Sequence, residues 1–290
     1  MEFKTLNKDE VLELYEKKCE KLETKPHPAF AKYLEDTVEE SDVVDVVVHG
    51  NNKLYFKNRL KDMDLIAISG TLEEYAVYIE EVDLRFNEIT CDGAKSLASL
   101  LKYSERLLGL NLQGNSIKVE GAQELAEALK ECKNLQYLNM NQNYIQTDGA
   151  MSITELLFTH HKLLELNLGN NEIDHDGMIG ILSVLNCSNY SLEVLNIENP
   201  RYKTICQATA IHFGKMLQNN LGIQKLNVRK HKLRCEGIYV ITEHLLENNT
   251  LRVLDINANE IAFQGCEAIA KYLKSENCAL EALHLSLIHI

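Results

Sequence analysis

Positively charged side chains gather in two stretches of a chain whose formal net charge is −13. Residues 199–203 hold Arg201, Tyr202 and Lys203, and residues 228–234 hold Arg229, Lys230, Lys232 and Arg234. Cations clustered in this way can bind an acidic peptide, a phosphate group or RNA, or serve as a nuclear import signal. The alternative interpretation is a solvated loop whose cations compensate the nearby Glu198 and Glu236.

A second candidate is a series of short polar side chains that recurs every 28 to 31 residues. It comprises Asp83, Asn111, Asn139, Asn167, Asn196, Asn227 and Asp255. Two residues after each of these comes a second series, Arg85, Gln113, Asn141, Gly169, Glu198, Arg229 and Asn257. The first series can hydrogen-bond to a protein partner along its length, or its amides can bond to one another on adjacent strands. The two interpretations are compatible.

No arrangement typical of a metal, cofactor or catalytic site stands out in the sequence. His160, His161 and His175 have no supporting carboxylates in a ligand arrangement, and the glycines form no phosphate-binding signature. We also find no Ser/His/Asp or Cys/His set of the kind that activates a nucleophile. The sequence therefore predicts a protein that is not an enzyme, with no cofactor and no metal.

The elements that must position these side chains are repeats. Eight positions recur twice at a period of 28 residues, with only Met or Ile in place of Leu. In their first occurrence they are Leu107, Leu110, Leu112, Asn115, Ile117, Gly121, Leu125 and Leu129. The pattern matches L-x-x-L-x-L-x-x-N-x-L, the template of leucine-rich repeats. The predicted fold class is α/β, a leucine-rich repeat solenoid (horseshoe) with a concave parallel sheet and convex helices.

Each repeat is expected to contain a strand, a turn and a helix. The strand leucines point inward, and the residues between them face the concave surface, because side chains alternate along a strand. The Asn of the template, called the anchor Asn below, can hydrogen-bond the backbone groups left unpaired where the strand ends. The Gly before each helix allows unusual backbone angles or close packing.

We expect residues 1–42 to form a helical N-terminal cap and residues 43–290 to form the solenoid, because a solenoid needs its apolar end covered. The anchor Asn occurs at 51, 87, 115, 143, 171 and 259, and Pro200 and His231 take its place in between. The solenoid then has about eight repeats and a truncated ninth. Leu287–Ile290 abandons the template, so we expect this terminus to be truncated or misread.

Composition bounds the location and the partners. Residues 1–10 lack the apolar core of a secretory signal, and no apolar run is long enough to span a membrane. The eight cysteines are dispersed without a Cys-x-x-Cys pair, which is typical of reduced thiols. We therefore expect a cytoplasmic or nuclear protein that is not secreted and binds no membrane. The acidic net charge favours basic protein partners and disfavours nucleic acid, except at the local basic stretches.

The period of 28 to 29 residues, with a Gly introducing a full helix, resembles the ribonuclease-inhibitor-like class of leucine-rich repeats from residue 43 to about residue 286. The irregular repeats add a closer likeness to one branch of this class, in the stretches 195–201, 216–220 and 230–233. This resemblance implies a non-enzymatic intracellular scaffold that binds one or more proteins. It also implies a cytoplasmic or nuclear location, the nucleolus included.

Two further functions are open within the class. One is activation of a GTPase, as by the activator of Ran, which presents residues on the loops after its strands; Arg201 or Arg229 can occupy such a loop. The other is inhibition of a ribonuclease. The founding ribonuclease inhibitor is richer in Cys and Trp, and the absence of Trp from this sequence weakens that comparison.

Overall fold

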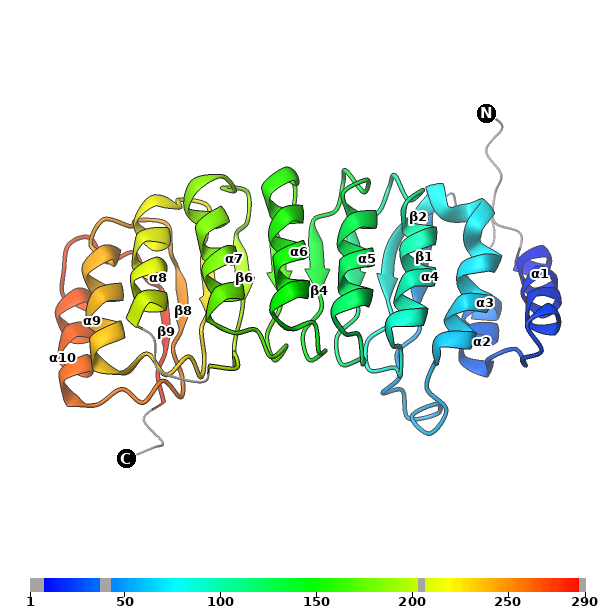
Figure 1. Ribbon diagram of the computed structural model, residues 1–290, viewed down its shortest axis with the longest axis horizontal. Helices are drawn as coiled ribbons and strands as arrows, with labels where there is room; N and C mark the ends of the chain where they lie inside the picture. The colour runs from blue at the N-terminus through cyan, green and yellow to red at the C-terminus, as the bar shows by residue number, and fades with distance from the viewer. Residues whose placement is uncertain (1–7, 37–42, 203–206, 287–290) are drawn as a thin grey trace. The chain divides into compact units, whose positions relative to one another are not determined.

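The computed structural model of the chain describes residues 8–36, 43–202 and 207–286 (Figure 1). The predictions made for Lys203 and for Leu287–Ile290 therefore lie outside the described residues. The chain divides into two compact units, Met1–Tyr144 and Ile145–Ile290. Both units are built from alternating parallel strands and helices.

The described part of the first unit begins with two helices, α1 (Lys8–Lys21) and α2 (Pro28–Asp36). Its parallel strands are β1 (Val44–Val47), β2 (Ile79–Asp83), β3 (Gly109–Asn111) and β4 (Tyr137–Asn139). Between the strands lie α3 (Asp62–Leu72), the 3-10 helix η1 (Glu73–Tyr78), α4 (Cys91–Leu101) and α5 (Val119–Leu129). The strands pair in chain order, which aligns the buried side chains of Val82, Leu110 and Leu138 in one layer of the core.

The second unit repeats the same plan. Its helices are α6 (Gln146–Thr159), α7 (His175–Cys187), α8 (Gln207–Asn219), α9 (Arg234–Leu245) and α10 (Phe263–Leu273). Its strands are β5 (Glu165–Asn167), β6 (Val194–Asn196), β7 (Lys225–Asn227), β8 (Val253–Asp255) and β9 (Ala282–His284). Neighbouring strands in this unit also pair in chain order and in parallel.

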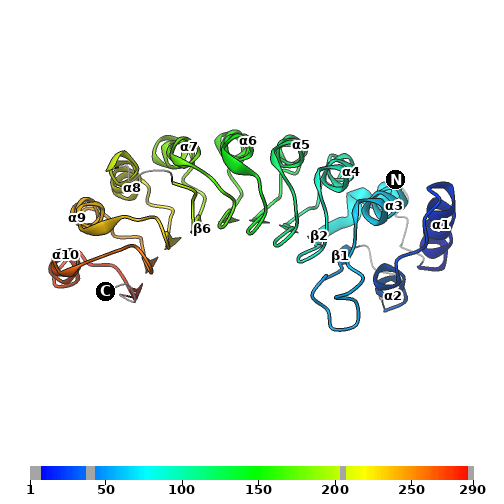
Figure 2. The same ribbon diagram turned by 60° about the horizontal axis from the view of Figure 1, so that its bottom comes forward.

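Within each unit, the helices that follow the strands lie along one face of the sheet (Figure 2). The opposite face, called the open sheet face below, is the one that the repeats leave uncovered by these helices. Parallel strands need a long crossover, and a helix in every repeat supplies it. This arrangement confirms the predicted α/β repeat fold with the sheet on one side and the helices on the other.

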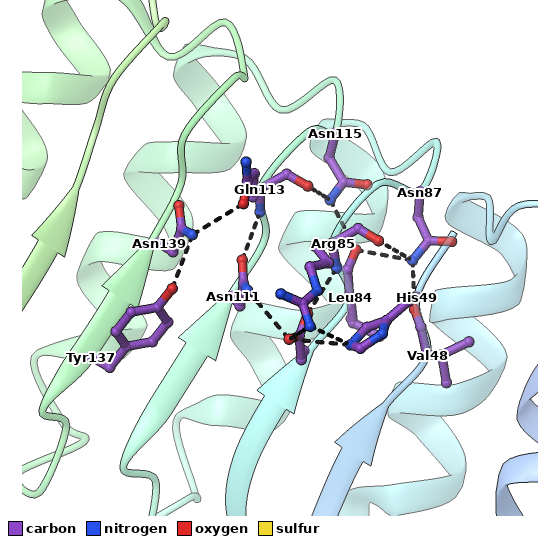
Figure 3. Close-up of polar contacts among 11 residues, drawn as sticks. Val48, His49, Leu84, Arg85, Asn87, Asn111, Gln113, Asn115, Tyr137 and Asn139 are labelled. Carbon is purple, nitrogen blue, oxygen red and sulfur yellow. Dashed lines mark hydrogen bonds and ion pairs between the residues drawn. The ribbon is translucent and has the colours of Figure 1, made fainter. Parts of the chain in front are cut away.

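The anchor Asn has the role expected from the sequence. The Nδ2 of Asn115 donates to the carbonyl of Leu84 at 3.0 Å (Figure 3). It also donates to the carbonyl of Leu112 at 2.9 Å, and the Oδ1 of Asn115 accepts from the Ile89 N–H at 3.2 Å. The same pattern recurs at Asn87, Asn143 and Asn259. These side chains are at most 5% exposed, so they satisfy backbone groups that water cannot reach.

The Gly near the start of each helix serves close packing. A Cβ on Gly121 would lie 3.0 Å from Cγ2 of Ile117 and 3.1 Å from Cβ of Ala94. The sequence predicted a Gly before each helix, whereas Gly121 lies within the first turn of α5. Its φ is not positive. Among the described glycines, a positive φ occurs at Gly114, in the loop before α5. Of the two reasons predicted for the helix-start glycines, packing is therefore the one that applies.

The two helices before β1 pack through aromatic side chains. The rings of Tyr15 and Phe30 meet edge to face at 4.8 Å between centroids, and the Tyr15 hydroxyl accepts from the His27 N–H at 3.0 Å. Helix α1 also contacts α3 of the repeats. Residues 1–7 and 37–42 of the predicted cap lie outside the described residues, and the role of residues 1–42 as a cap stays a prediction.

Candidate protein-interaction surfaces

The polar series of the strands aligns in register within each unit. In the first unit Asp83 pairs with Asn111, and Asn111 pairs with Asn139. In the second unit the aligned residues are Asn167, Asn196, Asn227 and Asp255, with His284 next to them. Each unit therefore carries one polar row across its strands.

Each member of a polar row bonds first to its own backbone. The Oδ1 of Asn111 accepts from the N–H of Gln113 at 3.1 Å. The same bond, to the N–H two residues on, forms at Asp83, Asn139, Asn167, Asn196, Asn227 and Asp255. Such a side-chain turn closes the strand. Lateral bonds are longer, as from Asn111 to Asp83 at 3.3 Å. The polar rows thus have a partly structural role. They fulfil it chiefly through side chain-to-backbone bonds, and less through the side-chain bonds between adjacent strands that the sequence predicted.

The two polar rows differ in how much of them solvent can reach. Asp83, Asn111 and Asn139 are only 4–6% exposed, whereas the row members of the second unit are half-buried. Arg85, two residues beyond Asp83, has a side chain that is 38% exposed. An accessible polar surface therefore exists in the second unit and at Arg85. The part of the three buried residues in partner binding stays a prediction.

A polar cluster at Asp83 includes His49, which the sequence analysis did not single out (Figure 3). The Nε2 of His49 lies 3.2 Å from Oδ2 of Asp83, and Nη2 of Arg85 lies 3.4 Å from the same oxygen. Nη2 of Arg85 is also 3.2 Å from Nε2 of His49. His49 stands two residues after Val47, which pairs with Asp83, so it occupies the place that Arg85 takes in the next repeat. The position of His49 two residues after a strand residue could have identified it from the sequence, but the irregular first repeat obscured this spacing.

The described cations of the irregular repeats lie in neighbouring loops of the second unit and, for Arg234, at the first residue of α9, and they are not equivalent. Three arginines pair with acids of adjacent repeats, Arg201 with Glu172 at 2.8 Å, Arg229 with Glu198 at 3.8 Å and Arg234 with Glu260 at 2.9 Å. Lys230 and Lys232 are exposed, and no salt bridge to either is found among the described residues. We call these five residues the basic edge. Two acids, Glu198 and Glu236, were predicted to compensate these cations. Glu198 does so, but the other acids that pair with the arginines are Glu172 and Glu260.

The backbone fixes the place of the two lysines. Lys230 has a φ of 59° and Lys232 a φ of 54°, both in the left-handed region. The residue before the anchor position is left-handed in the neighbouring repeats too, at Asn170, Asn199 and Ala258. The Lys230 N–H donates to the carbonyl of Asn257 at 3.1 Å, which ties the turn to the next repeat. The repeat geometry therefore holds both lysines on a defined turn.

Tyr202 belongs to the core of the irregular repeats and not to the exposed part of the basic edge. Its side chain is 8% exposed and stacks on His175 at 3.9 Å between ring centroids. Its hydroxyl lies 3.0 Å from Nδ1 of His231, and the ring of Phe213 meets His231 edge to face. His231 fills the anchor position, and its Nε2 lies 2.8 Å from the carbonyl of Ile197.

His231 is therefore a neutral imidazole inside the protein. Burial lowers the pKa of His231 to about 4, the hydrogen bond to Ile197 opposes this change, and the nearby His175 adds to it. In the neutral form, Nε2–H donates to the Ile197 carbonyl and Nδ1 accepts from the Tyr202 hydroxyl. The sequence marked His231 as a lost anchor Asn, whereas the structure assigns it a substitute role at the same position.

The described residues contain no group of three or more His, Cys, Asp or Glu side chains arranged to hold a metal ion. None of their helices combines the length and the apolar character needed to cross a membrane.

The fold and its repeated anchor Asn define a leucine-rich repeat protein. A model of the family described as Leucine Rich repeat matches residues 77–98, 131–153, 159–182 and 247–270. These segments lie in both units and each includes a strand of the sheet. The matched segments cover less than half of the chain, and over them the chain is similar to this family.

The chain is also similar to leucine-rich repeat-containing protein 34. It is 31% identical to the Mus musculus protein over 88 residues, which is 30% of this chain and 21% of the mouse protein. It is 30% identical to the Homo sapiens protein over 69 residues, 24% of this chain and 15% of the human protein. The matched stretches thus span about a fifth or less of the length of these relatives. Among solved structures, the chain named Leiomodin-1 Actin-Binding Site 2 matches with a TM-score of 0.38 and 17% identity, covering 63% of this chain and 86% of that one.

Proposed function

We propose that this chain is a non-enzymatic, intracellular scaffold whose basic edge binds an acidic segment of a partner protein, next to the polar row of the second unit. Leucine-rich repeats in general form protein-interaction scaffolds. The cytoplasm or the nucleus, with the nucleolus included, is the proposed location. None of the described cysteines is part of a disulfide, which supports this location.

The observation that carries the proposal is the unequal pairing within the basic edge. The three arginines already have acidic partners inside the chain, so a ligand would have to compete with Glu172, Glu198 or Glu260 for them. Lys230 and Lys232 are exposed, and no such pair competes for them among the described residues. A carboxylate of a partner protein can therefore pair with the two lysines without breaking an existing salt bridge.

The polar row supplies a neighbouring hydrogen-bonding surface. Asn227 lies three residues before Lys230, and its Nδ2 donates to Oε2 of Glu198 at 3.5 Å. Asn196 and Asp255 flank Asn227 in register on β6 and β8. An extended acidic segment that crosses the strands can then contact amides with its backbone and lysines with its side chains. Lys203, outside the described residues, stays a predicted member of this surface.

The test is capture of partners by the purified chain and by the double variant Lys230→Ala, Lys232→Ala. The matched control is Lys215→Ala, Lys271→Ala, which removes the same charge from exposed positions on α8 and α10. Captured proteins are identified by mass spectrometry, and their affinity is measured at two salt concentrations. We expect the edge variant to bind about tenfold more weakly, with a smaller salt dependence, and the control to bind like the parent chain.

Two results would refute this proposal. Equal losses in the edge variant and in the control would mean that only net charge matters. Loss of all captured material after ribonuclease treatment would mean that the basic edge holds nucleic acid and not protein. Circular dichroism of each variant verifies that a loss is not caused by unfolding.

An enzyme regulator of the GTPase-activating type is the second candidate. Its support is the position of Arg201 and Arg229 in the loops that follow β6 and β7. GTP hydrolysis measured with and without the chain, and with Arg201→Ala and Arg229→Ala, separates it from a scaffold. Inhibition of a ribonuclease is tested in the same way with a ribonuclease assay.

A further inference from the structure

Four positions on the open sheet face of the first unit form a second row, this time with a gap. Asp45 on β1 pairs with Glu81 on β2, Glu81 with Gly109 on β3, and Gly109 with Tyr137 on β4. Gly109 contributes no side chain, so the row is interrupted between an acid and an aromatic ring. A hollow of about 380 Å³ opens at this point, and all its lining residues belong to the first unit.

The walls of the hollow are chemically different. A Cβ on Gly109 would lie 3.6 Å from Cγ of Glu81 and 3.9 Å from Cδ1 of Tyr137, so these two side chains border the gap. The Tyr137 hydroxyl accepts from Nδ2 of Asn139 at 3.0 Å, which orients the ring (Figure 3). One wall is therefore a carboxylate and the other is the side of an oriented phenol ring.

The charge of the hollow is unbalanced. Asp45 and Glu81 are exposed and stand opposite each other on adjacent strands, where like charges destabilise a sheet. Neither forms a salt bridge among the described residues, and the third acid, Glu80, has Arg106 at 3.8 Å. A cation entering the hollow would therefore relieve a repulsion that the free protein retains.

The same geometry indicates which cation fits. The acids here are not arranged as ligands of a metal ion within the described residues, and the negative potential repels phosphate groups. A guanidinium group is planar, stacks on aromatic rings and donates to more than one carboxylate. We propose that the hollow at Gly109 binds an arginine side chain presented by a basic segment of a partner protein. This proposal rests on the scaffold function and names the partner chemistry of a second surface.

The experiment uses the whole chain and two fluorescein-labelled peptides, one alternating arginine with serine and one alternating lysine with serine. Binding is followed by fluorescence anisotropy. We expect Glu81→Gln to weaken the arginine peptide about fivefold, and Gly109→Leu, which fills the gap, to weaken it by more than about tenfold. Gly109→Ala is the milder substitute if the leucine variant does not fold. The charge-matched control is Glu124→Gln, an exposed position on α5, which should bind like the parent chain.

A stability measurement separates a binding role from a structural one. Because Glu81→Gln removes the like-charge pair, it should raise the melting temperature by about 1–3 °C while it weakens the peptide. Equal effects of Glu81→Gln and Glu124→Gln, no binding of the arginine peptide, or equal affinity for the lysine peptide would overturn the proposal. The variant Lys230→Ala, Lys232→Ala should keep the peptide affinity unchanged, so a failure here is distinct from a failure of the basic edge.

Discussion

His231 makes the stability of the second unit depend on pH, and the variant His231→Asn should remove this dependence. The imidazole is 3% exposed, and its Nε2–H donates to the carbonyl of Ile197 at 2.8 Å. In the regular repeats an anchor Asn makes the corresponding bond, as Asn115 does to Leu84. Asparagine at 231 would restore that template with a side chain that does not titrate.

The magnitude follows from the pKa of His231. Burial lowers this pKa to about 4 in the folded chain, against 6.5 for an ordinary histidine. The unfolded chain therefore binds the proton more readily, and the free energy of unfolding falls as the pH falls below 6.5. Linkage gives a loss of about 2 kcal/mol between pH 7 and pH 5, and about 3 kcal/mol by pH 4. At pH 7 and above, this contribution to stability is almost fully present.

The assay is urea denaturation of the parent chain and of His231→Asn at pH 7, 6 and 5, followed by circular dichroism. Other titrating groups affect both proteins alike, so the difference between the two free energies isolates His231. We expect the parent chain to lose about 2 kcal/mol more than the variant between pH 7 and pH 5. Because repeat arrays can unfold in parts, hydrogen exchange at the Asn199 N–H, which donates to Arg229, localises the loss to the irregular repeats.

Parallel losses of stability in the two proteins would refute this reasoning. They would mean that the buried imidazole does not control the acid sensitivity of the second unit. A lower stability of the variant at every pH is compatible with the reasoning, because asparagine gives up the ring contacts with Tyr202 and Phe213. The test therefore depends only on how the difference in the free energy of unfolding between the two proteins changes with pH.

The remaining predictions concern the repeat framework. Asn115→Ala leaves the buried Ile89 N–H unpaired and removes one of the two amide donors at the carbonyls of Leu84 and Leu112, so it should lower the free energy of unfolding by about 2–3 kcal/mol in urea denaturation. Asn134→Ala, which loses a surface bond, should change it by about 0.5 kcal/mol in the same assay. Gly121→Ala should cost about 1–3 kcal/mol in the same assay because its Cβ meets neighbours at 3.0–3.1 Å. Gly109→Ala should cost less than about 0.5 kcal/mol, since its nearest neighbour is at 3.6 Å. Equal losses for the paired variants would contradict the role given to packing and to the anchor bonds.

The fold could be predicted because every repeat is stabilised in the same way. Leucines at fixed spacing form the core, and the anchor Asn hydrogen-bonds the buried backbone groups at the end of each strand, which leucine side chains cannot do. The register of the polar rows then followed without further information, because a parallel strand pair aligns equivalent positions of neighbouring repeats. Asp83, Asn111 and Asn139 were therefore aligned correctly, although their burial was not foreseen.

The exposed sites could be predicted only in part. Spacing indicated that the cations of the irregular repeats lie close together. Whether each one forms a salt bridge depends on side-chain reach, so the sequence did not reveal that Arg201 pairs with Glu172 while Lys230 forms no salt bridge among the described residues. His49 was missed because its repeat departs from the template. The hollow at Gly109 was missed for a different reason. It depends on what a position lacks, and a glycine in a strand carries no sign of its neighbours Glu81 and Tyr137.

Pro200, Tyr202 and His231 depend on one another, although the template marks only Pro200 and His231 as irregularities, and each separately. Pro200 stands at an anchor position and has no side-chain donor, so it cannot serve the carbonyl of Ile197 in its own repeat. His231, one repeat later, donates to that carbonyl at 2.8 Å. A neutral imidazole has one donor and one acceptor, and with the donor used its acceptor takes the hydroxyl of Tyr202 at 3.0 Å. The burial of Tyr202 beside the basic edge is thus a consequence of replacing an anchor Asn with histidine, and this is why Tyr202 lies in the core while the adjacent Arg201 faces the solvent.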